Sequence, residues 1–143
     1  MRIAIAALAL LIAVPALAQK PAQGETDPQS LLRALGMAPD PDAVRRAVAA
    51  AEAHPLGSDR NPVRVGGPPG ERAYIARLRC ADGTPPRVGQ RGSAGIGVFG
   101  SIIDIYPLDC GDSAPGRVSL VMDMYHSAHR EDRAPPGFTI LPR

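Results

Sequence analysis

The segment Asp123-Met124-Tyr125-His126-Ser127-Ala128-His129 holds the densest group of side chains that could do chemistry. Asp123, His126 and His129 offer oxygen and nitrogen donors of the kind that zinc accepts. Their spacing would bring them to one metal ion if the segment became helical after Tyr125. Further ligands would have to come from Asp104, Asp109 or His54. We favour the alternative, a strand end that runs into a polar loop with solvated histidines, because His-x-x-His is not a specific metal spacing. We therefore expect no metal or other cofactor.

An Asp-x-Tyr pattern occurs twice, as Asp104-Ile105-Tyr106 and Asp123-Met124-Tyr125. Residues i and i+2 of a strand share a face, so each strand should place a carboxylate beside a phenol. If both pairs share one face, they form a polar patch of two acids and two hydroxyls. Paired carboxylates can do acid-base work when their surroundings separate their pKa values. We favour a structural role, since no nucleophile is identifiable nearby. The expected partners of this patch are Arg77 and Arg79.

Two short motifs imitate known sites. The stretch from Gly95 to Gly100 matches G-x-G-x-x-G, but the dinucleotide fingerprint needs a strand before it and a helix after it. Here a Pro/Gly loop precedes and an apolar strand follows, which indicates a bulge or close backbone packing. Gly111-Asp112-Ser113 resembles the nucleophile loop of trypsin-like serine proteases over three residues. Ala114-Pro115 replaces the glycines which that family needs there, so we interpret Ser113 as a loop serine and expect no catalytic residue.

The only cysteines are Cys80 and Cys110. An even number in an exported chain favours a disulfide bond between them. The alternative is a pair of buried free thiols.

The first part of the domain reads as two short helices. Asp27-Pro28 and Asp40-Pro41 are helix-start signals, because each provides an N-cap followed by proline. An apolar stripe follows the first signal and Gly36 ends that helix. Apolar residues recur at i, i+3, i+4 and i+7 after the second signal, until His54-Pro55.

The remainder reads as strands. Residues 56–72 are rich in Gly and Pro and predict a linker. Alternation over 73–80 predicts a strand with one wet face, and apolar runs predict strands over 98–106 and 118–125. Residues 137–140 could form a short edge strand. Helices followed by strands indicate an α+β fold, with two N-terminal helices on a small, antiparallel-rich mixed sheet of three to four strands.

The expected disulfide constrains the order of these strands. A bond needs Cα atoms within about 7 Å, whereas the ends of the strand 98–106 lie about 30 Å apart. In a simple meander Cys80 would lie at the wrong end of that strand. The bond therefore predicts that the strand 73–80 runs parallel to the strand 98–106, with the strand 118–125 between them.

The N-terminus predicts export. A positive charge at Arg2 precedes an apolar run from Ile3 to Val14, and Ala16-Leu17-Ala18 forms an A-x-A cleavage site. This order is that of a signal peptide, residues 1–18, and the run is shorter than the roughly 20 residues that span a bilayer. We expect cleavage between Ala18 and Gln19, a flexible arm over 19–26, one domain over 27–143, and a periplasmic or secreted location without a transmembrane segment in the mature chain.

Composition narrows the function. Without Arg2, 15 of the 16 basic residues remain against 14 acidic ones, so the mature net charge is +1. Such a chain lacks the basic patch of a nucleic-acid-binding protein. Two Phe, three Tyr and no Trp make a stacking platform for bases or sugars unfavourable.

Three stretches resemble those of small uncharacterised exported proteins of proteobacteria, over most of residues 54–140. They are Asn61-Pro62-Val63, Cys80-Ala81-Asp82-Gly83 and Asp123-Met124-Tyr125-His126. The resemblance implies no particular activity. We expect a non-catalytic domain that binds a protein or envelope component. The alternative is a small metal-dependent hydrolase that uses the Asp123/His126/His129 region.

Overall fold

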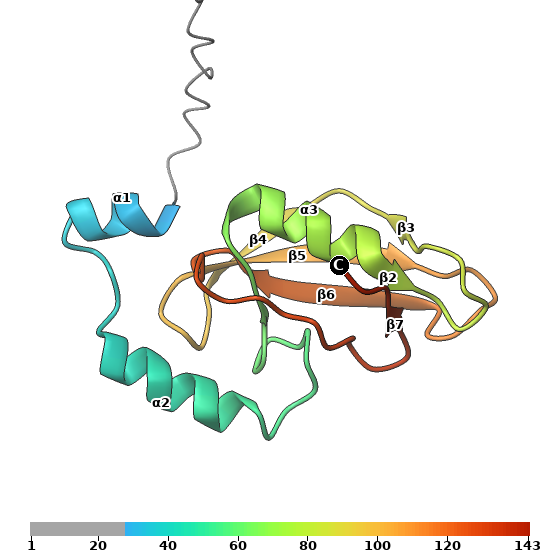
Figure 1. Cartoon of the computed structure of the whole chain (residues 1–143), viewed down its shortest axis with the longest axis horizontal. Helices are drawn as coiled ribbons and strands as arrows, with labels where there is room; N and C mark the ends of the chain where they lie inside the picture. The colour runs from blue at the N-terminus through green and yellow to red at the C-terminus, as the bar shows by residue number, and fades with distance from the viewer. Residues whose placement is uncertain (1–27) are drawn as a thin grey trace, which may run out of the picture.

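The computed structural model describes residues 28–143 of the chain. The predicted signal peptide and the arm 19–26 lie outside these residues. The described part has an α+β fold, as expected, with three helices and a mixed sheet (Figure 1). The helices are α1 (Pro28–Ala34), α2 (Pro41–Ala51) and α3 (Gly67–Arg77). The strands are β1 (Val63–Arg64), β2 (Leu78–Arg79), β3 (Arg87–Val88), β4 (Gly92–Ile96), β5 (Ile102–Asp109), β6 (Arg117–Asp123) and β7 (Thr139–Ile140).

The two N-terminal helices begin where their sequence signals lie. Asp40 caps α2 by accepting hydrogen bonds from the backbone N–H groups of Asp42 and Ala43, at 3.1 and 3.2 Å. Pro41 occupies the first turn, where a missing N–H costs nothing. Helix α1 buries none of its residues, whereas α2 buries Ala51 at its C-terminal end.

The main sheet has five strands in the order β1-β6-β5-β3, and β4 also pairs with β5. β5 and β6 form an antiparallel hairpin in which Tyr106 lies opposite Leu120. β5 continues through Pro107 to Asp109, beyond the expected end at Tyr106. Proline is tolerated there because Pro107 lies opposite the break between β3 and β4, where it needs only to accept a hydrogen bond from Gly89 N–H.

The segment that was expected to be a linker and then a strand is a helix. Helix α3 occupies residues 67–77, and only Leu78–Arg79 of the expected strand 73–80 is extended, as β2. The buried residues of this segment recur with the period of a helix, at spacings of three and four: Glu71, Tyr74, Ile75 and Leu78. The first of them is charged, so the apolar pattern alone did not indicate a helix. Pro68-Pro69 starts the helix. The third helix also means that the helices are not confined to the N-terminus.

The disulfide between Cys80 and Cys110 is present, with Cα atoms 5.8 Å apart. The strand order that we inferred from it was wrong. The neighbour of β6 on the side away from β5 is β1, which runs parallel to β6. Helix α3, and not a strand of the main sheet, brings Cys80 close to Cys110. Gly67, at the start of α3, donates a backbone hydrogen bond to the Met124 carbonyl just after β6. The helix then passes over the sheet, so that Cys80, shortly after its end, lies beside Cys110 at the C-terminal end of β5.

The core lies between α3 and one face of the sheet. Its fully buried side chains include Leu78, Leu108, Met122 and Val63. Each such side chain stabilises the fold by about 1.5–3 kcal/mol. In Figure 1, α3 lies over β5 and β6, while α1 and α2 lie beyond the end at which β6 finishes. The expected edge strand is β7, which pairs with β2 in a separate two-stranded sheet. No helix within residues 28–143 is long and apolar enough to cross a membrane.

Candidate binding cleft and the acidic groups behind it

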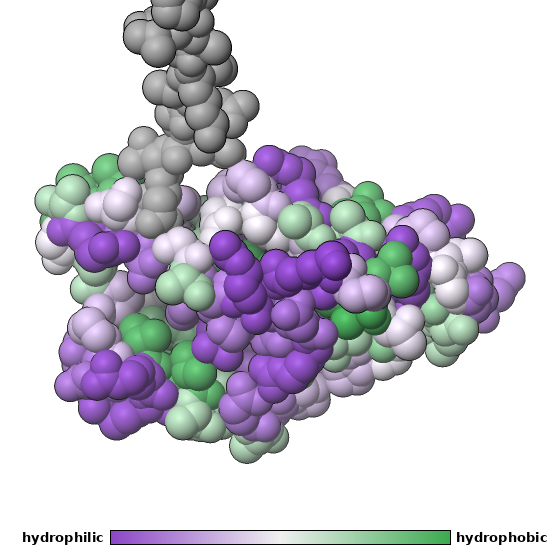
Figure 2. Space-filling model, viewed as in Figure 1, coloured by the Kyte–Doolittle hydropathy of each residue, from purple (hydrophilic) through white to green (hydrophobic). Residues whose placement is uncertain are grey.

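A cleft of about 430 Å³ lies between the N-terminal helices and the end of the sheet. This volume falls in the range of small-molecule pockets. One wall comes from α1, α2 and their connection. Its apolar part is Leu32, Pro39, Pro41 and Val44, and polar and charged residues border it: Gln29, Arg33, Asp40 and Arg45. The floor comes from the sheet side: Phe99, Ser101, Tyr125 and His126. Figure 2 shows apolar surface in the hollow between the two helices. We call this feature the α1–α2 cleft.

The glycine-rich motif builds one side of the α1–α2 cleft. Its residues form β4, a turn and the approach to β5, so no helix follows them, and the expected bulge lies between Ser93 and Ile96. Gly100 has a φ of +81°, and a Cβ atom there would lie 3.2 Å from Pro39 Cγ. The turn therefore packs closely against the connection between α1 and α2. This contact gives the motif a structural explanation without a nucleotide.

Asp123 organises the floor of the cleft from beneath. It is fully buried, and its Oδ2 accepts a hydrogen bond of 2.5 Å from Ser101 Oγ. Its Oδ1 accepts one of 3.0 Å from the backbone N–H of Tyr125. His126 Nε2 lies 3.4 Å from Asp123 Oδ2 but forms no hydrogen bond with a described residue. The Phe99 ring meets the His126 ring edge-on at 5.3 Å. These contacts fix the floor side chains before any ligand arrives.

The structure does not bring the three candidate metal ligands together. His126 lies near Asp123, whereas His129 Nε2 lies 3.4 Å from Glu131 Oε2. Burial lowers the pKa of His129. Asp109 is at the other end of the sheet with Arg87 and Arg117, and the His54 carbonyl accepts from Asn61. Within residues 28–143 no three His, Cys, Asp or Glu side chains converge as a metal site would require.

The four-residue polar patch is divided between two faces. Asp104 lies opposite Met122 in the hairpin, and residues that lie opposite each other share a face. Asp123 is the next residue along β6, so its side chain points to the other face of the sheet. Asp104 and Tyr106 do share a face, as expected, and it is the face that α3 covers. The expected arginine partners are elsewhere. Arg77 pairs with Asp132, and Arg79 donates to backbone carbonyls of α3 and β2.

The partner of Asp104 and Tyr106 is Glu71, which sequence reasoning placed in a linker. Glu71 is fully buried, and its Oε2 accepts a 2.9 Å hydrogen bond from Tyr106 O–H. Arg91 Nη1 lies 3.5 Å from the same oxygen and 3.8 Å from Asp104 Oδ2. Burial, together with the neighbouring carboxyl of Asp104, raises the pKa of Glu71 to about 7, against the opposing effect of the Tyr106 hydrogen bond. The missed signal was the helical spacing from Glu71 to Tyr74 and Ile75.

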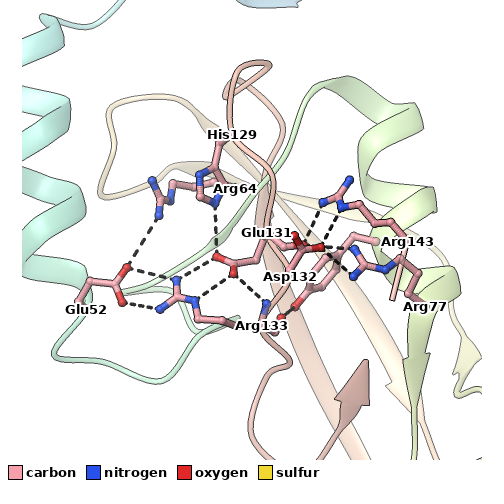
Figure 3. A network of polar contacts seen from close by, with 9 residues as sticks. Glu52, Arg64, Arg77, His129, Glu131, Asp132, Arg133 and Arg143 are labelled. Atoms are coloured by element: carbon pink, nitrogen blue, oxygen red, sulfur yellow. Dashed lines mark hydrogen bonds and ion pairs between the residues drawn. The ribbon is translucent and has the colours of Figure 1, made fainter. Parts of the chain in front are cut away.

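A second polar network holds the loop after β6 (Figure 3). Buried Glu131 accepts hydrogen bonds from Arg133 Nε and Nη2, both at 2.9 Å. Arg133 also contacts Glu52 at the end of α2, at 2.6 and 3.2 Å. Asp132 joins Arg77 and Arg143. All of these charged groups are occupied by one another, so the network positions the loop that carries His126 and is not free to hold a ligand.

Ser113 does not resemble a nucleophile in its surroundings. Its Oγ accepts a 3.1 Å hydrogen bond from the backbone N–H of Asp82. It lies in the turn between β5 and β6, near the disulfide. This contact ties two loops together and is consistent with the interpretation of Ser113 as a loop serine.

A second hollow, of about 450 Å³, lies along β3, β5 and β6. Its lining includes Val88, Pro107 and Val118, and also Arg87 and Arg117, which both pair with Asp109. Because the charged groups of this second hollow already pair with one another, the α1–α2 cleft is the better candidate site.

Comparisons with family models, curated proteins and solved structures found no match for the chain.

Proposed function

We propose that this chain is a small exported domain without catalytic activity, and that it binds part of a protein or envelope component in the α1–α2 cleft. The observation that carries the proposal is the cleft itself. It combines apolar walls at Leu32 and Val44 with a floor of hydroxyl and imidazole groups. That combination suits a ligand with an apolar body and a hydrogen-bonding end. Export is supported by the signal-peptide pattern of residues 1–18 and by the disulfide.

The polar groups of the floor favour binding over catalysis. A serine nucleophile needs a base that accepts its proton, usually a histidine that a carboxylate orients. Here Ser101 donates directly to Asp123, and His126 approaches the same carboxylate oxygen. Asp123 thus lies between the serine and the histidine. The order of groups in a catalytic triad is absent from the α1–α2 cleft, and the same contacts serve to hold the floor rigid.

An NMR-detected fragment screen of the mature, oxidised protein tests this proposal. The library should contain small aromatic and aliphatic amides and carboxylic acids. We expect hits to shift the backbone amide signals of Phe99, Ser101, Tyr125 and His126 together. Val44→Arg should abolish binding, because a charged side chain would fill the apolar wall.

Val88→Arg is the matched control, because it places the same charge on an exposed valine outside the cleft. It should leave binding unchanged. A screen whose hits shift signals elsewhere, or bind Val44→Arg as well as the parent protein, would contradict the proposal.

A further inference from the structure

Two carboxyl groups face each other inside the contact between α3 and the sheet. Glu71 projects from α3 with no exposed surface, and the side chain of Asp104 on β5 is only 6% exposed. Glu71 Oε1 and Asp104 Oδ2 are both buried, and neither has a hydrogen-bond partner among the described residues. Both carboxyl groups lie against the same guanidinium nitrogen, because Arg91 Nη1 is 3.5 Å from Glu71 Oε2 and 3.8 Å from Asp104 Oδ2. Two buried carboxylate oxygens without donors are costly unless a proton lies between them.

The charges around the pair do not balance two carboxylates. The segment between β3 and β4 supplies Arg91, which lies within 4 Å of both carboxyl groups and is 45% exposed. β5 supplies Tyr106, whose hydroxyl donates to Glu71. The loop after β6 supplies Tyr125, whose pKa is raised by burial first and then by the nearby acids, Asp104 and Glu71 among them. Both tyrosines are neutral near pH 7, because the pKa of each lies above its ordinary value. One guanidinium then faces two carboxyl groups, and the cluster is neutral only if one of them keeps its proton.

We propose that Glu71 keeps a proton that it donates to the buried carboxylate of Asp104, and that this proton-binding pair makes the contact between α3 and the sheet sensitive to pH. In the protonated state Glu71 donates a hydrogen bond to Asp104, and Arg91 balances the remaining negative charge. When the proton dissociates to solvent, two negative charges lie together in a buried space with one half-exposed cation. Their repulsion acts directly between α3 and β5, so this contact loosens.

The direction of the pH dependence follows from the surroundings of the pair. Burial and Asp104 raise the pKa of Glu71 from its ordinary 4.5 to about 7 in the folded protein. The folded state then binds more protons than the unfolded state between these two values. The stability that the pair contributes is therefore fully present below about pH 4.5 and is lost as the pH rises through about 7.

Thermal unfolding of the mature, oxidised protein between about pH 5 and about pH 8 tests this inference. We expect Glu71→Gln to flatten the fall of Tm with pH and to give a higher Tm than the parent at pH 8, because an amide can donate to Asp104 at any pH. Asp104→Asn should flatten the slope in the same way. Asp112→Asn, a change in an exposed loop acid, should leave the slope as in the parent.

An infrared measurement makes the test independent of whether the variants fold. The parent protein in D₂O at about pH 6 should show the carbonyl stretching band of a protonated carboxyl group, and the band should disappear at about pH 8. It should be missing from Glu71→Gln at both values. Parallel Tm curves for the parent and Glu71→Gln, or a parent without the band at pH 6, would overturn the inference. Neither result depends on ligand binding in the cleft.

Discussion

Glu71 and Glu131 are both buried glutamates, yet their surroundings move their pKa values in opposite directions. Glu71 is buried, faces another carboxyl group and has one guanidinium nitrogen at 3.5 Å, and its pKa is raised. Glu131 receives two direct hydrogen bonds from Arg133 and a third from the Arg133 backbone N–H. These bonds outweigh the effect of burial and lower the pKa of Glu131 to about 2. At the residue scale, the number of donors decides whether a buried acid keeps its proton.

Glu131→Gln should destabilise the protein at neutral pH by about 2–3 kcal/mol, as the lowered pKa implies after allowance for the half-exposed Arg133. Because the folded pKa lies below the ordinary value of 4.5, the stability is present above about pH 4.5 and is lost as the pH falls toward 2. Urea unfolding at several pH values measures both effects. Glu52→Gln removes the exposed partner of the same arginine and should cost under about 1 kcal/mol. Equal losses in the two variants would contradict this account.

At the scale of elements, short sequence patterns predicted the helices and strands whose formation depends on neighbouring residues. Asp40-Pro41 and the apolar period after it predicted α2, and the apolar runs predicted the hairpin of β5 and β6 to within a few residues. Helix α3 was missed because Glu71, a charged residue, occupies a core position at its start. Sequence patterns treat a charge as a sign of exposure. Only its tertiary contacts, with Tyr106 and Arg91, show why this one is buried.

The disulfide belongs to this scale because it joins the segment after α3 to the end of β5. It closes a loop with a sequence separation of 30 residues, for which chain entropy gives about 3–4 kcal/mol of stabilisation. Complete reduction should lower the free energy of unfolding by that amount and leave the far-UV circular dichroism spectrum unchanged. Urea unfolding with and without reductant, on one protein preparation, makes the comparison without a mutation. Coincident unfolding curves after a thiol assay shows full reduction would argue against it.

The whole molecule combines a sheet core under α3 with two helices that leave a cleft open. The order of the expected helices and strands predicted the α+β class, and cysteine parity predicted the disulfide, because both depend on counts and local order. The cleft could not be predicted, since its floor joins Phe99 and Ser101 to Tyr125 and His126 across the fold. For the same reason the sequence could not show that the two Asp-x-Tyr pairs are divided between two faces of the sheet. That division depends on the strand register, which sets Asp104 opposite Met122 and which no local pattern encodes.

The proposed export concerns the whole chain. When the full-length protein is expressed in a bacterium with a secretory pathway, we expect the exported form to begin at Gln19. The reason is the order of Arg2, the apolar run and Ala16-Leu17-Ala18. N-terminal sequencing of the periplasmic or secreted material measures this directly. Ala18→Phe, which places a large residue at the cleavage site, should block processing. An intact Met1 on cytoplasmic protein would contradict the expectation.

The most direct test of the central claim is the position of a bound fragment. For a hit from the NMR screen, intermolecular nuclear Overhauser effects report which protein protons lie beside it. We predict effects to the methyl groups of Val44, on the apolar wall of the α1–α2 cleft, and to the ring of Phe99, on its floor. Effects to Val88 and Val118, in the hollow along β3, would show that ligands bind at the other site and would contradict the account.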